Sequence, residues 1–479
     1  MLPDAFNRAR AGQTRTEIAR VREEIHVWLE RRTKADTHQQ YVTTLQLLEN
    51  LFRAALDEID LAARKLDAMS EPALWSEARR LDRALVWVRR VWDYFRRRFD
   101  QRDQPLMQPL LAAADEVVWS CYVEPFRALG RKHQAAPLPY IEDRFSPQTT
   151  PRVDPPPDLQ SDVDAAFLTR YLSELPVAVI GLPPTSLEHP WWLVYLAHET
   201  GHQVQYDLVS DPKWGLVGAF GTLLAETAEQ AGGAAARQRW ETWGRELFAD
   251  LYSVLMVGPA AIWSILELEY ADTAGMLRGK SSYPPPVIRL SVMARMLTKL
   301  DVASDLYLLG IDPEALTTGD PVTELTRDLR ADAARDLKIV PAVVDRLAAE
   351  PLVDDKTLPE LCAWSAASFE PGGDVAGWGE KLVRKNPPYP ESNVTAARLS
   401  TAGAVLAWTK ICRDTAGPPG TVEEIAARRD AARKDLKAMM LATVPKCREE
   451  GTREVQAPPT GDAVQCGKEL ASLVLEAGR

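Results

Sequence analysis

Apolar side chains recur every three or four residues through about the first 130 residues of the chain, the period of an amphipathic helix. Three stripes follow this spacing: Ile18, Val21, Ile25 and Trp28; Leu45, Leu48, Phe52 and Leu56; and Leu85, Val88, Trp92 and Phe95 on a helix expected from Leu81 to Phe99. Long helices that each carry one apolar stripe pack by burying the stripes together. The pattern therefore predicts an antiparallel helical bundle at the N-terminus.

The pattern changes in the middle of the chain, where whole segments are apolar. One apolar helix is expected to begin at Pro190, and another is expected from about Ala234 to Val257. The run from Val254 to Leu266 contains Gly258-Pro259, which predicts two buried helices joined by a turn. After Leu300 helical periodicity returns with proline breaks, through residues 396–409 and 422–440. Residues 177–181 form the one convincing strand nearby.

A proline-rich stretch divides the chain, with seven prolines between Ala136 and Asp158. Such a stretch is typical of a linker or of an extended segment that wraps over the next domain. We predict a mostly α (α+β) fold with a small sheet, divided into an N-terminal helical bundle (1–135), a proline-rich linker (136–160), a central core (161–310) and a C-terminal helical domain (311–479).

Composition fits a folded protein: 479 residues can form two to three domains, 46% of them are hydrophobic and 14 are Trp. The net charge of −11 gives no general attraction to nucleic acid. A strip of arginines on the helix of residues 81–99 is interleaved with Asp82, Asp93 and Asp100, which favours a solvated, salt-bridged face over contact with a protein partner or a phosphate backbone.

Location in the cell is predicted from three features. No apolar segment follows Met1, the longest apolar run is too short to span a bilayer, and the five Cys are scattered without CxxC spacing. This combination predicts a cytoplasmic protein without a membrane contact or a cysteine-based metal site.

The chemistry is concentrated in one motif, His198-Glu199-Thr200-Gly201-His202. At about 100° per residue, two histidines four residues apart lie on one helical face, one turn apart, and can reach one Zn²⁺ together. Glu199 would lie beside the metal, where a carboxylate can take a proton from a zinc-bound water. The alternative is a buried histidine pair whose polar groups are satisfied within the core.

A third ligand is needed, and His202 is the last histidine in the chain. The upstream histidines lack a ligand-like setting, so a carboxylate is expected. Glu246 and Asp250 are again i and i+4 on an apolar helix, and a buried acidic pair is costly unless both groups are committed. Glu246 as ligand, with Asp250 accepting the free N–H of a metal-bound imidazole, satisfies both. The alternative is a capped or solvated acidic pair, and the rival ligands are Asp207, Glu226 and Glu229.

HExxH followed some forty residues later by Glu246-Leu247-Phe248-Ala249-Asp250 resembles the gluzincin group of zinc metallopeptidases, the thermolysin-like arrangement. Metzincins are excluded, because Gln205 and Leu208 stand where their longer motif has Gly and His. The resemblance covers residues 175–300 and implies a zincin-like catalytic core. It also implies that His198, His202 and Glu246 are the ligands, Glu199 the general base and Asp250 the carboxylate behind a ligand.

A further segment, Ser282-Tyr283-Pro284-Pro285-Pro286-Val287-Ile288-Arg289-Leu290, resembles the HPPxxxR segment of some gluzincins, with Tyr283 in place of the histidine. The Tyr283 hydroxyl or Arg289 would then stabilise an oxyanion. The alternative is structural: a proline starts a helix, and Arg289 anchors a neighbouring segment.

We therefore expect a zinc-dependent peptidase that hydrolyses peptide bonds of a peptide or protein substrate through a zinc-bound water activated by Glu199. Two alternatives stay open: a zinc-bearing helical scaffold that binds a partner without hydrolysis, and a protease kept inactive until a partner displaces the N-terminal bundle. A gluzincin-like sheet edge would bind the substrate backbone as an added strand.

Overall fold

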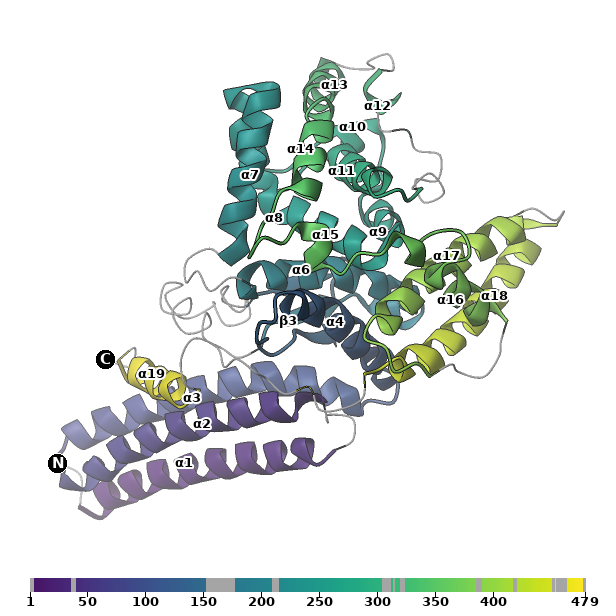
Figure 1. Ribbon diagram of the computed structural model, residues 1–479. Coiled ribbons are helices and arrows are strands. Elements are labelled where there is room, and N and C mark those ends of the chain that lie inside the picture. Colours follow the sequence, from purple (N-terminus) through teal and green to yellow (C-terminus); the bar gives the residue numbers. More distant parts are fainter. Residues whose placement is uncertain are drawn as a thin grey trace.

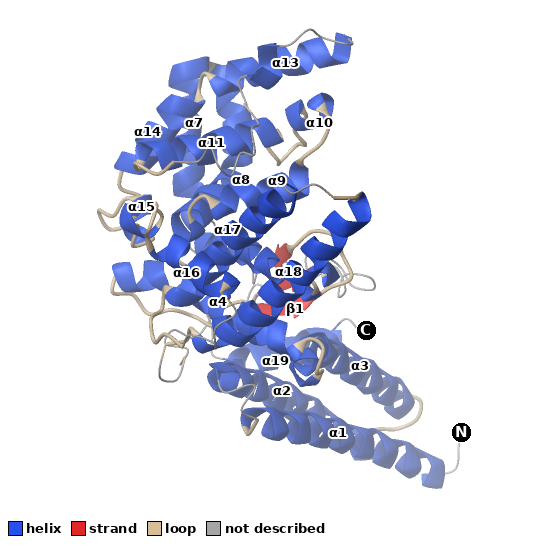
Figure 2. Ribbon diagram, turned by 90° about the vertical axis from the view of Figure 1, so that its right-hand side faces the viewer, coloured by secondary structure: helices blue, strands red, loops and turns tan. Residues whose placement is uncertain are grey.

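Helices dominate the structure, and one small sheet lies among them (Figures 1 and 2). The computed structural model describes residues 4–35, 40–151, 177–208, 215–303, 312, 315–318, 324–384, 390–416, 420–449, 453 and 463–476. The prediction of a mostly helical fold with a small sheet is confirmed. The helices are α1 (Asp4–Thr33), α2 (Val42–Ala63), α3 (Ala73–Asp100), α4 (Gln108–Ala128), α6 (Leu196–Asp207), α7 (Gly215–Gly232), α8 (Ala234–Val257), α9 (Ala260–Glu269), α10 (Thr273–Leu277), α11 (Pro286–Lys299), α12 (Ala315–Thr318), α13 (Glu324–Leu337), α14 (Val340–Ala349), α15 (Leu358–Leu361), α16 (Asp374–Val383), α17 (Ala396–Ala416), α18 (Val422–Thr443) and α19 (Ala463–Glu476).

The N-terminal bundle consists of α1, α2 and α3, joined by the last described helix of the chain, α19 (Figure 1). The three predicted stripes are buried in its core, and Trp28 packs against that core from a partly exposed position. Helix α19 lies against α2 and α3, and a Cβ on its Gly467 would come within 2.2 Å of the backbone oxygen of Leu51. Helix α19 thus packs closely enough to complete the bundle, although it lies within the predicted C-terminal domain of residues 311–479.

A second, larger core extends from Leu110 in α4 to Cys447 beyond α18. Helix α4 lies within the predicted N-terminal range of 1–135, yet it packs in this second core against α6 and α17. The helices between residues 324 and 443 also belong to it and do not build a separate core. The boundaries predicted at residues 135 and 311 therefore do not coincide with the boundary between the two cores.

The sheet connects the two cores. Its strands are β1 (Leu138–Ile141), β2 (Gln148–Thr150) and β3 (Val179–Leu182), in the order β1-β3-β2. Strand β1 runs parallel to β3 and β2 runs antiparallel to it. Because side chains alternate along a strand, Val179 contacts the bundle core while Ile180 and Leu182 contact the second core.

Two of these strands arise inside the stretch predicted as a linker, residues 136–160. Residues 136–151 are part of the folded structure, and residues 152–160 lie outside the described residues. The strand predicted at residues 177–181 is β3. A composition rich in proline therefore concealed two short strands, which have too few residues for a clear alternation.

The arginine strip on α3 is engaged by acidic neighbours: Arg80 pairs with Glu77, Arg96 with Asp93 and Arg89 with Glu24 of α1. These contacts support the interpretation of a salt-bridged face. Among the described residues, none of the helices combines the length and the apolarity that a membrane crossing requires.

Candidate metal centre

Helix α6 carries the HExxH motif through the interior of the second core. The predicted helix at Pro190 begins as a 3₁₀ segment, Pro190–Tyr195, and continues as α6. Residues 196–205 are all buried, so the polar side chains of the motif have to be satisfied within the protein. The imidazoles of His198 and His202 lie one turn apart, with ring centroids 4.8 Å apart and planes at 89°.

Gly201, between the two histidines, lets α6 approach α8 closely. A Cβ at this position would lie 3.0 to 3.2 Å from the side chain of Tyr252 on α8. Its φ is not in the left-handed region, so the requirement here is for space. The glycine inside the motif therefore sets how near the acidic residues of α8 come to the histidines.

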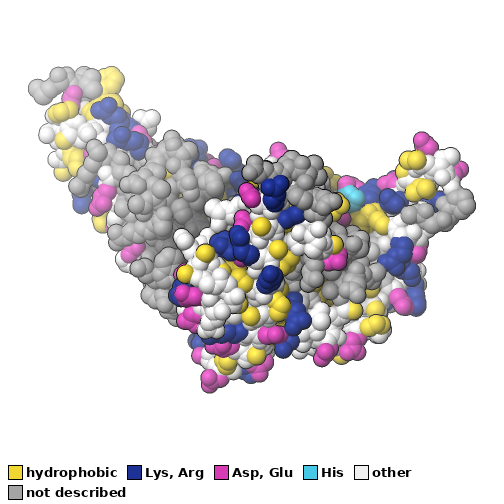
Figure 3. Space-filling view, turned by 90° about the horizontal axis from the view of Figure 1, so that it is seen from above, with side chains coloured by type: hydrophobic (Ala, Val, Ile, Leu, Met, Phe, Trp, Pro, Cys, Tyr) yellow, Lys and Arg dark blue, Asp and Glu magenta, His cyan; other side chains and the backbone are white. Residues whose placement is uncertain are grey.

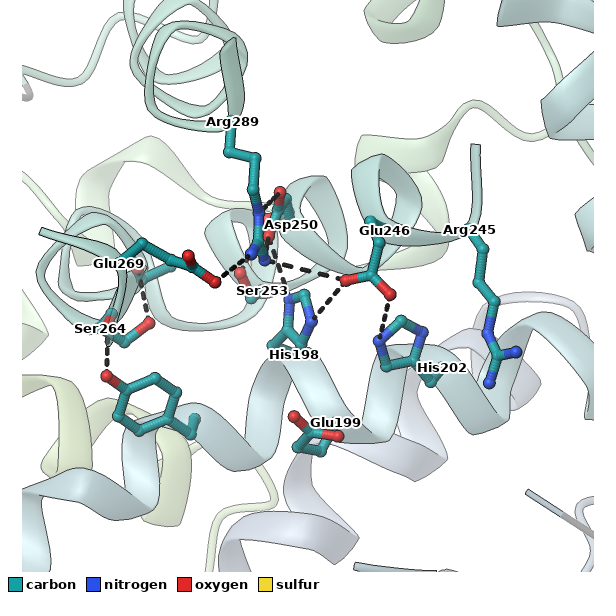
Figure 4. A network of polar contacts seen from close by, with 12 residues as sticks. His198, Glu199, His202, Arg245, Glu246, Asp250, Ser253, Ser264, Glu269 and Arg289 are labelled. Atoms are coloured by element: carbon teal, nitrogen blue, oxygen red, sulfur yellow. Dashed lines mark hydrogen bonds and ion pairs between the residues drawn. The ribbon is translucent and has the colours of Figure 1, made fainter. Parts of the chain in front are cut away.

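Helix α8 brings Glu246 and Asp250 to the same place, as the i, i+4 spacing predicted. The helix lies between Gly233 and Gly258, both at positive φ, and has the predicted bounds. The ligand atoms of His198, His202 and Glu246 all lie within 4.8 Å of one another, and Figure 4 shows the three side chains facing one another. Glu246 Oε2 lies 3.6 Å from His198 Nε2, and Glu246 Oε1 lies 3.7 Å from His202 Nε2.

Asp250 lies behind this group, on the far side of the His198 ring. Its Oδ1 lies 3.1 Å from His198 Nδ1, which leaves Nε2 of the same ring directed at Glu246 (Figure 4). A carboxylate at Nδ1 fixes the tautomer and the orientation of an imidazole ligand. The structure thus places Asp250 where it can orient His198.

Arg289 of α11 provides the counter-charge for Asp250. Its Nε and Nη2 donate to the two carboxylate oxygens at 2.8 and 2.7 Å, and both side chains are almost fully buried. Its Nη1 also donates to Glu269 of α9 at 3.4 Å. Pro286 is the first residue of α11, as in the structural alternative for this segment. These contacts match the anchoring role considered for Arg289, with Asp250 and Glu269 as the groups that it holds.

The charges at the site leave room for a cation. Three buried carboxylates, Glu199, Glu246 and Asp250, lie near one buried guanidinium, that of Arg289. Burial alone would lower the pKa of His198, but its contacts with Asp250 and Glu246 raise that pKa to about 9. Burial lowers the pKa of His202 to about 3. The acidic neighbours of His198 thus favour a positive charge at this position, which is also what a metal ion would supply.

The same contacts act on the carboxylates. Burial would raise the pKa of Glu246, but the facing imidazoles of His202 and His198 lower it to about 2. Asp250 is likewise buried, and Arg289 holds the pKa of its carboxyl well below the usual range. Glu246 is thus ionised and available as a ligand across the pH range in which proteins are stable.

The donor set fits a metal ion in chemistry and in spacing. Bonds of 2.0 to 2.1 Å in a tetrahedral site separate neighbouring ligand atoms by about 3.4 Å. The observed 3.6 and 3.7 Å join the two imidazoles to different oxygens of Glu246, and one ligand atom from each of the three residues lies within 4.8 Å of the other two. The buried His-His-Glu group is therefore able to bind a metal ion.

Glu199 shares the site without belonging to the donor group. Its carboxylate is buried and accepts a hydrogen bond from Thr149 of β2, with Thr149 Oγ1 2.7 Å from Glu199 Oε2. Burial raises the pKa of Glu199, and the charge of His198 and the hydrogen bond from Thr149 offset part of that rise. Sequence reasoning missed Thr149, because it stands in the proline-rich stretch with no local signal of chemistry.

A cavity of about 440 Å³ opens beside the His-His-Glu group. One wall is the segment 146–151 around β2, and another contains Tyr195, Ile265 and Leu268. Tyr283, on the segment before α11, also lines the cavity and is 45% exposed. The negative charge of Glu246, together with partial burial, raises the pKa of the Tyr283 hydroxyl.

The rival residues lie in other contacts. Asp207 accepts hydrogen bonds from Tyr122 and Gln203, Glu226 pairs with Arg346 and Glu229 pairs with Arg237. Of the upstream histidines, His133 packs against Trp119, His189 packs against Trp191 and His26 is exposed. His38 lies outside the described residues.

Among the described residues, His198, His202 and Glu246 form the one group of three such ligands close enough to hold an ion. The chain matches no protein-family model, no curated protein and no solved structure, so its function has to be inferred from this site.

Proposed function

We propose that the chain is a zinc metallopeptidase of the gluzincin type, with His198, His202 and Glu246 as zinc ligands and Glu199 as general base. The observation that carries the proposal is that a buried carboxylate outside the donor group lies at the same cavity as the donors. A purely structural metal site needs no such base and is usually closed, whereas this group opens onto a cavity of about 440 Å³.

The donor types favour zinc among the common metals. Two imidazoles and one carboxylate suit a borderline ion, while magnesium and calcium prefer oxygen ligands alone. When bound, zinc polarises a carbonyl group and lowers the pKa of a water molecule toward about 7. Every other step falls to side chains of the chain itself.

Glu199 has the position and the surroundings of a proton carrier. In the proposed reaction its carboxylate accepts a proton from the attacking water and then delivers it to the amine nitrogen of the leaving group. Its burial keeps competing water away from the carboxylate and strengthens its interaction with charge that develops nearby.

Two further residues have proposed roles that follow from their contacts. Tyr283 lines the cavity and has a hydroxyl able to donate to the carbonyl oxygen of a substrate. The guanidinium of Arg289 is committed to Asp250, so we assign it to positioning rather than to the oxyanion. The ring orientation of His198 then depends on Asp250 and, one contact further out, on Arg289.

The substrate class follows from β2. This strand lies at an edge of the described sheet, and the segment 146–151 that contains it lines the cavity. A peptide can add to such an edge through its backbone, which is a general way to hold an extended chain. Pro147 and Pro151 flank the strand and lack N–H donors, so pairing is limited to residues 148–150.

The test is Glu199→Gln, which keeps the shape of the side chain and leaves the three donors in place. We expect about one zinc per chain by elemental analysis in both proteins, and a loss of about 100- to 10,000-fold in hydrolysis of a proteome-derived peptide library by the variant. Glu229→Gln, in an exposed pair with Arg237, is the matched control and should cleave as the wild type does. Equal rates for Glu199→Gln and wild type, or a zinc-loaded wild type that cleaves nothing, would refute the proposal.

A further inference from the structure

We propose that Thr149 is a positioning residue for Glu199, and that β2 thereby both carries the substrate and sets the general base. The proposal rests on the function proposed above and adds a residue to that site. Thr149 Oγ1 lies 2.7 Å from Glu199 Oε2 and 2.8 Å from the backbone oxygen of Glu199. Both residues are buried, 8% and 7% exposed.

The hydroxyl has one hydrogen and two acceptors within reach. With an ionised Glu199, it donates to the carboxylate. When Glu199 takes up a proton on its other oxygen, Oε1, Oε2 remains an acceptor and Thr149 Oγ1 continues to donate to it. One side chain can thus hold the carboxyl group in place before and after proton transfer, without a movement of heavy atoms.

The sheet explains why this residue reaches α6. Thr149 is paired with Ile180 of β3, and Ile180 is buried in the second core. Because side chains alternate along a strand, the exposed Gln148 projects to the opposite side of the sheet from Thr149. The backbone edge of β2 opposite β3 lies at right angles to this direction, and among the described residues no strand pairs with it.

The same strand, β2, would therefore fix the positions of both the general base and the substrate. A peptide paired with residues 148–150 lies at a fixed offset from Thr149, and Thr149 fixes the carboxylate of Glu199. Glu199 also lies on α6, beside the ligand His198, so the contact ties the metal helix to the substrate strand. A displacement of about 1 Å at such a contact can cost on the order of 100-fold in rate.

Another account of the contact is that Thr149 merely satisfies a buried carboxylate and so contributes to stability alone. The two accounts differ in what Thr149→Val changes. Loss of a structural hydrogen bond lowers the melting temperature but leaves the carboxylate in place and kcat intact. Loss of positioning moves the carboxylate and lowers kcat at nearly constant KM, because zinc and the substrate edge are retained.

The experiment compares Thr149→Val, Thr149→Ser and the control Thr409→Val, which removes another buried threonine hydroxyl that donates within α17 at 2.9 Å. For Thr149→Val we expect wild-type zinc content, kcat lower by about 10- to 100-fold and KM within about threefold. Thr149→Ser restores the hydroxyl and should recover kcat to within a few fold. Thr409→Val should keep the wild-type kcat.

A structural readout decides the proposal independently of activity. In a crystal structure of zinc-loaded Thr149→Val, we expect the Glu199 carboxylate to leave the position that it has in the wild type, and in Thr149→Ser to keep it. A carboxylate that stays in place in Thr149→Val, or a kcat that Thr149→Ser does not restore, overturns the positioning role. Absence of hydrolysis in the wild type would instead refute the proposed function, and the position of Glu199 would still decide the role of Thr149. If Thr149→Val does not fold, the crystal structure of Thr149→Ser decides instead. A Glu199 carboxylate that is displaced although the hydroxyl is retained would overturn the positioning role.

Discussion

The surface of the N-terminal bundle and the interior of the second core each contain a histidine beside a glutamate at the same distance, with opposite consequences. In the N-terminal bundle, His26 Nδ1 lies 3.6 Å from Glu49 Oε1, and the two side chains are 56% and 37% exposed. In the second core, His198 Nε2 lies 3.6 Å from Glu246 Oε2, and both side chains are 8% exposed. Water solvates the first pair, whereas the second depends entirely on protein neighbours or on a metal ion.

The comparison shows which feature indicates a ligand site in a mostly helical protein. Many charged pairs of the bundle helices, such as Arg20 with Glu17 and Arg22 with Asp57, are well exposed, and such pairs contribute little to stability. Residues 196–205 of α6 and the part of α8 from Glu246 to Val257 are buried throughout and still contain His198, His202, Glu246 and Asp250. A polar group on a helix without a solvent face needs a committed partner, and several such groups at one place indicate a ligand.

The largest difference in stability and zinc binding is expected between two separate variants, each of which breaks one of the histidine–glutamate pairs. Glu246→Ala should abolish zinc binding and hydrolysis, because the site keeps two protein donors. It also removes the buried partner of both imidazoles, so we expect a loss of about 3 to 5 kcal/mol in the free energy of unfolding. Glu49→Ala should change that free energy by less than about 1 kcal/mol and leave zinc bound. Denaturant titration and elemental analysis measure both, and a zinc-loaded Glu246→Ala would contradict the ligand assignment.

Asp250→Ala should destabilise by a similar amount, about 3 to 5 kcal/mol, because the buried Arg289 loses the carboxylate that accepts from its Nε and Nη2. Zinc affinity should fall by about 10- to 100-fold, since His198 loses the carboxylate at Nδ1. The control is Arg102→Met, which breaks the equally buried Arg102–Asp115 pair at the junction of α3 and α4. It should cost comparable stability with unchanged zinc affinity. If both variants weaken zinc equally, the effect of Asp250 is general destabilisation.

Removal of the metal should affect the second core and leave the N-terminal bundle unchanged. Zinc at 1,000 times its dissociation constant stabilises the native state by about 4 kcal/mol, and a chelator removes that contribution. We expect faster amide hydrogen exchange in α6, α8 and α11 after chelation, and unchanged exchange in α1, α2 and α3. Hydrogen-exchange mass spectrometry makes the comparison, and equal deprotection of both cores would show that they unfold as one unit.

The smallest expected effects concern two helical glycines. Gly201→Ala places a Cβ 3.0 to 3.2 Å from Tyr252, so we expect a loss of about 1 to 3 kcal/mol and weaker zinc binding. Gly12→Ala in α1 meets no atom within 4 Å and should stabilise the bundle by about 0.5 to 1 kcal/mol. Thermal unfolding checks both signs. A stabilising Gly201→Ala would mean that the spacing of α6 and α8 does not depend on this glycine.

The sequence by itself determined the helices of the bundle and the spacing of the candidate metal ligands along α6 and α8. Each apolar stripe of the bundle is a local pattern, set by the 3.6-residue period, and it predicted which face of α1, α2 and α3 is buried. The same period placed His198 and His202 on one face of a helix, and Glu246 and Asp250 on one face of another. Local backbone geometry fixes these relations, so they can be deduced without the fold.

Tertiary structure alone decided which elements meet. Helix α4 is buried on nearly every side, so it has no stripe to indicate its partner, and it packs away from the bundle that precedes it. Helix α19 returns across hundreds of residues to close that bundle. The contacts of Arg289 with Asp250 and of Thr149 with Glu199 likewise join segments 39 and 50 residues apart. Such pairings depend on how buried surfaces fit in three dimensions, and a sequence pattern records burial without recording the partner.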